Sequence, residues 1–150
     1  MKTFKQIREE LKALIEASPA LAGVPVLLEH EGEIDAAIEA ALAAGGLVVA
    51  VWMVSGGVAD SVSGGGVSTR VQVPVSVIEN PARCRDTANG GIGIALEDAV
   101  QNIIGATLGR PCGHGEVALG MEIFARADSS AGELETVIGF EVPLVIRPSV

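Results

Sequence analysis

Residues 47–54 form an almost unbroken apolar run, LVVAVWMV, and this run constrains the fold more than any other stretch of the chain. Strands with one solvated face alternate between apolar and polar residues, whereas strands covered on both faces read as continuous apolar runs. The run is also too short to span a bilayer. It therefore predicts a strand in the middle of a sheet, with other elements covering both of its faces.

Hydrophobic spacing of three and four residues predicts three amphipathic helices, at residues 3–17, 34–44 and 92–108. Thr3 and Gln6 have the spacing of a capping box at the start of the first helix. The pair Gly45-Gly46 is typical of the end of a helix and follows the second one. These three stretches are therefore assigned to helices.

Period-two alternation predicts further strands at residues 69–78, 117–127 and 133–146, and a short strand at 24–28. Pro74 cannot donate a hydrogen bond to a neighbouring strand, so we expect residues 69–78 to form an edge strand or to contain a bulge. Residues 128–132 are expected to form the turn of a hairpin. In strand 117–127 the expected core face is Val117, Leu119, Met121 and Ile123. In strand 133–146 it is Leu134, Ile138, Phe140, Val142 and Leu144.

The resulting element order, α-β-α-β-β-α-β-β, predicts a single α+β domain over residues 1–150. We expect a mixed, mostly antiparallel sheet of four to five strands, with three helices packed mainly on one face. No second domain, internal repeat or linker is evident in the sequence.

Two stretches without periodicity, residues 55–68 and 79–91, are expected to be long loops. The first contains five glycines. Loops of this length in compact domains are either functional or disordered, so we interpret both as partner-facing. In strand 133–146, three carboxylates lie opposite the expected core face, where charge could steer the docking of a partner subunit. The candidate interface residues are Gly56, Asp60, Gly65, Arg70, Asn80, Arg83, Arg85, Glu133, Glu135 and Glu141.

Charge and composition disfavour several classes of function. The formal net charge is −9 and only 3% of the residues are aromatic. A phosphate backbone would be repelled, and few side chains are available on which bases could stack. We therefore expect no nucleic-acid sequence recognition. The charged, helical N-terminal segment does not resemble a signal peptide, and we expect a cytoplasmic protein without a membrane segment.

Cys112 and His114 form the one pair that suggests chemistry, as a nucleophile with its base or as half of a metal site. Cys84 and His30, the remaining residues of these two types, are far away in the sequence. We interpret the pair as ordinary turn residues and keep a small cytoplasmic Cys/His enzyme as an alternative. The glycines at 64–66 are not followed by the Gly-Lys-Ser/Thr of a phosphate loop, so we do not expect a nucleotide-binding site there.

An ordered set of stretches gives the chain a resemblance to a known family. The stretches are SPAL at 18–21, VPV at 24–26, IDAAIEAAL at 34–42, VSVIENP at 75–81 and ALEDAV at 95–100. Together they resemble the tail terminator, or tail completion, proteins of tailed phages and prophages, the class of the minor tail protein U.

The resemblance implies a small mixed sheet packed against helices, no cofactor and no catalysis. It implies a homo-oligomeric ring, often a hexamer, that caps the tail tube, stops its growth and offers a surface to the head-completion protein. Such a protein would assemble in the host bacterial cytoplasm and reside in the virion tail. A head-tail neck, or connector, protein of similar fold is the alternative within this group.

Overall fold

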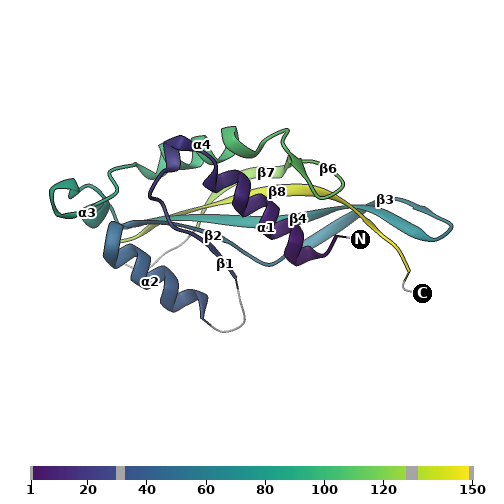
Figure 1. The fold of residues 1–150 in the computed structure, drawn as a ribbon, viewed down its shortest axis with the longest axis horizontal. Helices are drawn as coiled ribbons and strands as arrows, with labels where there is room; N and C mark the ends of the chain where they lie inside the picture. The colour runs from purple at the N-terminus through teal and green to yellow at the C-terminus, as the bar shows by residue number, and fades with distance from the viewer. Residues whose placement is uncertain (1, 30–32, 128–131, 149–150) are drawn as a thin grey trace.

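A six-stranded mixed sheet is the centre of the computed structural model, which describes residues 2–29, 33–127 and 132–148 (Figure 1). The order is β1-β2-β4-β8-β7, and β3 pairs with β4 beside β2. Among the strand pairs of the described residues, β1 with β2 is the one parallel pair. The strands are β1 (Val26–Leu28), β2 (Leu47–Val51), β3 (Gly56–Ser63), β4 (Gly66–Glu79), β7 (Ala118–Ala127) and β8 (Leu134–Ile146).

A separate small ladder is formed by β5 (Pro111–Cys112) and β6 (Gly115–Glu116). The predicted α+β class with a mixed, mostly antiparallel sheet is therefore confirmed. The strands are more numerous than the four to five expected from the sequence.

The long strand β4 lies inside the sheet and keeps an unbroken register with β8, so neither alternative predicted for residues 69–78, an edge strand or a bulge, is correct. It has 14 residues and pairs with β8 from Val67 to Glu79. Its other side pairs first with β3 and then with β2. The carbonyl of Pro74 accepts the backbone N–H of Trp52, and the proline nitrogen faces the same side. At this position the neighbour of β4 changes from β2 to β3, so neither strand needs a hydrogen bond from residue 74. A proline can therefore stand within this interior strand.

Residues 55–68 are not the flexible loop predicted from their glycines. They form β3, a tight turn and the start of β4, which together make a hairpin that projects beyond α1 (Figure 1). Gly65 lies in the turn with a φ of +116°, a conformation that favours glycine. The ladder shifts register between Ala59 and Ser61, which marks a bulge and breaks the alternation of side chains. This hairpin is called the arm below, together with the end of β8 at residues 144–146.

Helices cover both faces of the sheet. The longer ones are α1 (Phe4–Glu16), α2 (Ile34–Gly45) and α4 (Leu96–Thr107), and the short ones are α3 (Pro81–Cys84) and the 3-10 turns η1 (Pro19–Leu21) and η2 (Thr87–Asn89). The predicted capping box is present, because Thr3 Oγ1 accepts the N–H of Gln6 while Gln6 Oε1 accepts that of Thr3. The third predicted helix begins at Leu96 rather than at residue 92.

The core has two parts, one on each face. Under α1 and α4 lies the larger cluster, to which β4 contributes its four alternating valines and β8 contributes Ile138, Phe140, Val142 and Leu144. The predicted core face of β8 is thus confirmed for these four residues. On the opposite face, Ile38 and Leu42 of α2 pack against Val48, Ala50 and Ile78. The apolar run of β2 is buried on both sides, as predicted, because α2 lies opposite α1 and α4.

The predicted core face of β7 is only partly correct. Its ladder with β8 shifts between Leu119 and Phe124. Val117, just before the strand, is buried and Leu119 packs against the core, whereas Ile123 is 45% exposed. Of the predicted turn at 128–132, residues 128–131 lie outside the described part of the chain. Within that part, none of the helices has the length and apolar character needed to cross a membrane.

Truncation of Phe140 tests the position of the core. Phe140 is fully buried, and we expect Phe140→Ala to lower the free energy of unfolding by about 3–5 kcal/mol because a cavity replaces the ring. Phe4→Ala is the matched control, since Phe4 is 47% exposed on α1 and should change stability far less. Urea denaturation followed by circular dichroism measures both; similar losses in the two variants would contradict this core.

Candidate interaction surface

Three of the predicted interface residues meet in one ion-pair cluster. Arg70 of β4 donates from Nε to Asp60 of β3 at 3.0 Å and from Nη1 to Glu141 of β8 at 3.1 Å. The three strands are neighbours, and the cluster lies on the face opposite α1 and α4. Because the Arg70 side chain is 45% exposed, solvent weakens these ion pairs, and their contribution to stability is modest. The charge of Arg70 is therefore largely balanced by Asp60 and Glu141 within the chain.

A second polar network crosses the same face and includes Glu135. Trp52 Nε1 donates to Ser76 Oγ at 2.7 Å, and this hydroxyl in turn donates to Glu135 Oε2 at 2.8 Å. Ser76 is buried, so the network links β4 to β8 and to the residue that follows β2 at a partly buried position. Glu133, another predicted interface residue, directly precedes β8 and is half-buried. The acidic side chains of β8 are thus partly engaged inside the molecule.

The predicted loop at residues 79–91 is a compact connection that contains α3 and η2, so the expectation of a long loop throughout is wrong. Asn80 Oδ1 accepts the N–H of Arg83 and caps α3. The guanidinium of Arg83 donates to the carbonyls of Ala43 and Ala44, the last turn of α2. These contacts hold α3 against the end of α2, a structural role that uses two of the predicted interface residues.

Glu79 is a structural residue that the sequence did not reveal. It is 1% exposed, and its Oε2 accepts the backbone N–H of Leu96 at 2.8 Å. Ala95, which precedes α4, has no side chain able to cap the helix, so Glu79 supplies the acceptor from the end of β4. Arg85 Nη2 lies 3.9 Å from the other carboxylate oxygen. The one indication in the sequence was that Ala95, just before α4, has no side chain able to cap the helix.

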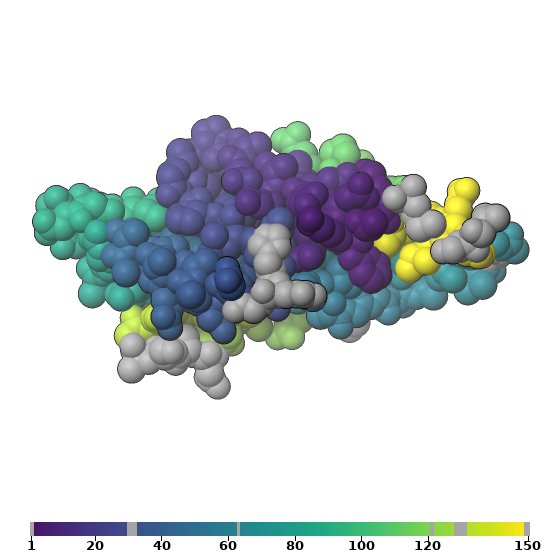
Figure 2. Space-filling view, turned by 60° about the horizontal axis from the view of Figure 1, so that its bottom comes forward, coloured from purple at the N-terminus to yellow at the C-terminus, as the bar shows by residue number. Residues whose placement is uncertain are grey.

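The arm carries the remaining predicted residues, Gly56 and Gly65, and lies at the opposite end of the molecule from α3 (Figure 2). The two predicted partner-facing segments are therefore not brought together. On the arm, Val62 is 76% exposed, Val58 48% and Ile146 41%. A shallow hollow of about 400 Å³ lies between Val62, Val67 and Ile146 near the turn. The arm thus presents apolar side chains that the helices leave uncovered.

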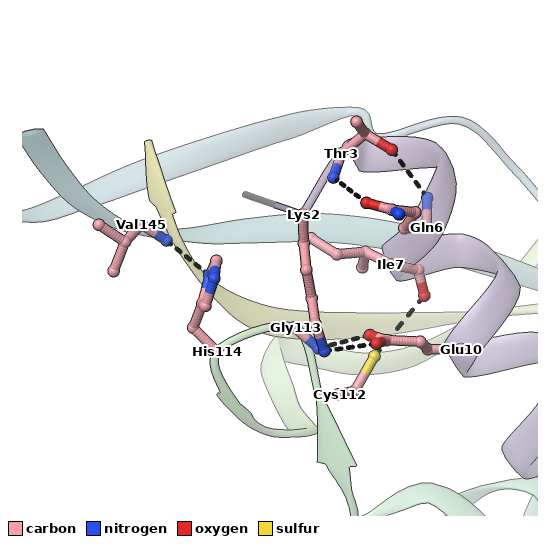
Figure 3. Close-up of polar contacts among 9 residues, drawn as sticks. All are labelled: Lys2, Thr3, Gln6, Ile7, Glu10, Cys112, Gly113, His114 and Val145. Atoms are coloured by element: carbon pink, nitrogen blue, oxygen red, sulfur yellow. Dashed lines mark hydrogen bonds and ion pairs between the residues drawn. The ribbon is translucent and has the colours of Figure 1, made fainter. Parts of the chain in front are cut away.

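Cys112 and His114 do not converge (Figure 3). The Cys112 thiol is buried and points to the carbonyl of Ile7 at 3.6 Å. The ring of His114 lies in another direction, where Nδ1 accepts the backbone N–H of Val145 at 3.1 Å. Among the residues that the structure describes, no group of three or more His, Cys, Asp or Glu side chains is placed to hold a metal ion.

The surroundings of Cys112 also oppose thiolate formation. Burial, followed by the charge of Glu10, raises the pKa of Cys112 to about 12. Burial acts to raise the pKa of Glu10 too, but hydrogen bonds from Lys2 and from the N–H of Gly113 outweigh it, and the net pKa is lowered. Glu10 therefore stays ionised beside a thiol that keeps its proton at neutral pH. This arrangement does not suit a nucleophile.

Comparison with known proteins adds no family to this picture, because no family model matches the chain and a search of curated proteins finds no match. The function is therefore inferred from the residues and from the surfaces that the fold presents.

The capping role of Glu79 gives a direct test of the connection between β4 and α4. We expect Glu79→Leu to lower the free energy of unfolding by about 1–3 kcal/mol, because the N–H of Leu96 loses its acceptor in a buried site. Glu79→Gln keeps a carbonyl oxygen at this position and should lose less. Urea denaturation of the two variants measures the difference; equal losses would contradict the capping role.

The raised pKa of Cys112 predicts a pH dependence of stability. Between the ordinary value of 9.0 and about 12, the unfolded chain loses the thiol proton while the folded chain retains it. The free energy of unfolding therefore falls as pH rises, by at most about 1.4 kcal/mol per pH unit from this group. Cys112→Ala should show a shallower decline between about pH 9 and 11. Parallel curves for wild type and variant in urea titrations would refute this.

Proposed function

We propose that this chain is a structural assembly protein of a tailed phage or prophage, which forms a ring on the tail tube and ends tube growth. The phage role rests on the resemblance of the ordered stretches at residues 18–26, 34–42, 75–81 and 95–100 to tail terminator proteins. The self-assembly half of the proposal rests on the surfaces described above. Partners would be further copies of the chain, the tail tube protein and the head-completion protein.

The observation that carries the proposal is the arm with its uncovered apolar side chains. Val62 is 76% exposed at the far end of a hairpin that projects from the helix-covered body (Figure 1). Contiguous exposed apolar groups mark interaction sites on otherwise soluble proteins. A projecting element that docks on a different surface of the next copy makes a heterologous contact, and such contacts close into rings when the rotation allows.

The enzyme alternative gains no support from the geometry of its two residues. The thiol of Cys112 is protonated at neutral pH, and His114 makes a hydrogen bond to β8 instead of facing the sulfur. The thiol points to the backbone carbonyl of Ile7 on α1. Interaction between surfaces therefore accounts for the described features better than catalysis by this pair.

Deletion of the gene in its phage tests the proposed role. We expect particles with overlong tails, because nothing stops polymerisation of the tube, and complementation with the wild-type chain should restore the normal length. Electron microscopy measures the tail lengths directly. Finished tails detached from heads would identify a neck protein instead, and unchanged, infectious particles would overturn both roles.

Assembly of the purified chain is the companion measurement. We expect light scattering to give a mass that rises with concentration from one subunit to a closed oligomer, and electron microscopy to show rings. A single-subunit mass at every accessible concentration would count against a ring that forms from the free chain.

A further inference from the structure

The strand β7 is a free edge of the sheet. It is last in the strand order, and β8 is its one strand partner among the residues described. The outer backbone groups of an edge strand offer a template for another strand, and proteins normally blunt such edges. Here the edge carries two adjacent apolar residues, Ile123 at 45% and Phe124 at 56% exposure. Two of the three phenylalanines in the chain, Phe4 and Phe124, are thus exposed, but only Phe124 lies on a strand edge.

A bulge shapes this edge. Between Leu119 and Phe124 the ladder with β8 shifts register, and Gly139 lies opposite the shift. A Cβ atom at Gly139 would lie 2.8 Å from the carbonyl oxygen of Glu122, so the absence of a side chain there lets the bulged strand approach β8. Bulges commonly re-aim side chains at sheet edges. The bulge in β7 therefore depends on Gly139 of β8 as well as on the sequence of β7.

The opposite side of the sheet has another free edge, β3. Along the path β3-β4-β8-β7, it is separated from β7 by the two central strands. Its Val58 and Val62 are exposed, and within the described ranges it pairs with β4 alone. The remaining edge strand, β1, has three residues and contacts both α1 and α2, so it is short and partly covered. The chain therefore presents two different, exposed, apolar strand edges.

We infer that β7 of one copy receives β3 of a second copy, so that the sheet continues from subunit to subunit through the Ile123–Phe124 edge. The two edges match in two respects. Among the described residues, each strand pairs on one side only, so its outer backbone groups can receive another strand, and each carries exposed apolar side chains. A second copy of the chain therefore supplies a strand edge that suits the edge of β7.

The contact has a direct consequence for assembly. Because β3 and β7 are different surfaces, each copy that joins leaves one free β3 and one free β7 for the next, which is a heterologous contact. Pairing of β7 with β7 would instead produce a closed dimer and stop. This inference rests on the proposed self-assembly and specifies which surfaces make it.

Two complementary variants test the pairing. Phe124→Lys blocks β7, and Val62→Lys blocks β3; both sites are exposed, so the fold should be retained. Alone, each variant should remain monomeric at concentrations where the wild type assembles, with the association midpoint raised about tenfold or more. Mixed in equal amounts, they should form a 1:1 heterodimer, because the intact β3 of one variant meets the intact β7 of the other. Native mass spectrometry resolves these species.

Phe4→Lys is the matched control, since it replaces an equally large and similarly exposed ring on α1, outside both strands, and should assemble as the wild type does. Circular dichroism confirms folding of each variant, and Ile123→Lys with Val58→Lys provides a second pair if either first variant unfolds.

Three outcomes would overturn the inference. If the wild type forms rings and Phe124→Lys or Val62→Lys does so equally well, the β7–β3 contact is wrong while the proposed function stands. If Val62→Lys dimerises alone and Phe124→Lys is monomeric, β7 pairs with itself. If the wild type never associates, the proposed ring fails, and the inference fails with it.

Discussion

The pairing of β4 with β8 is the interaction on which the rest of the structure depends. It runs from Val67 to Glu79 and places the valines of β4 beside Ile138, Phe140 and Val142 on one face. Together these side chains form an apolar face that packs against the buried sides of both α1 and α4. On its other side, the same strand supports β2 near one end and β3 near the other. The helix-covered body and the projecting arm are therefore two parts of one continuous ladder.

Polar side chains and apolar side chains have divided roles on this molecule. The charged residues that first suggested an interface are largely engaged within the chain, as Arg70 is by Asp60 and Glu141, and Arg83 is by the end of α2. Such contacts help to fix the register of the strands and the positions of the helices. Several of the large apolar side chains that stay exposed lie on the arm and along β7. Burial of apolar surface is the main driving force of association, so these are the groups with most to gain from a partner.

The acidic character of the chain fits this division. A net charge of −9 makes copies of the chain repel one another, and salt reduces this repulsion. At ordinary ionic strength, repulsion between exposed charges more than about 8–10 Å apart is largely screened, so two copies can approach until their apolar edges make contact. Specificity would come from strand register, since a shift by one residue turns every side chain of a strand to the other face.

The sequence by itself determined the features that local contacts control. The capping box at Thr3, the end of α2 at its glycines, the core face of β8 and the double-sided burial of β2 all follow from residues close together in the chain.

The pairing of distant strands decided the remaining features of the fold. Residues 56–63 form a strand because β4 lies beside them, Pro74 is tolerated because the neighbouring side changes from β3 to β2 there, and α2 occupies the second face because β2 has both faces to bury. The exposed edge at Phe124 likewise depends on a bulge opposite Gly139. Each of these depends on which distant strand becomes the neighbour, and local periodicity carries no record of that choice.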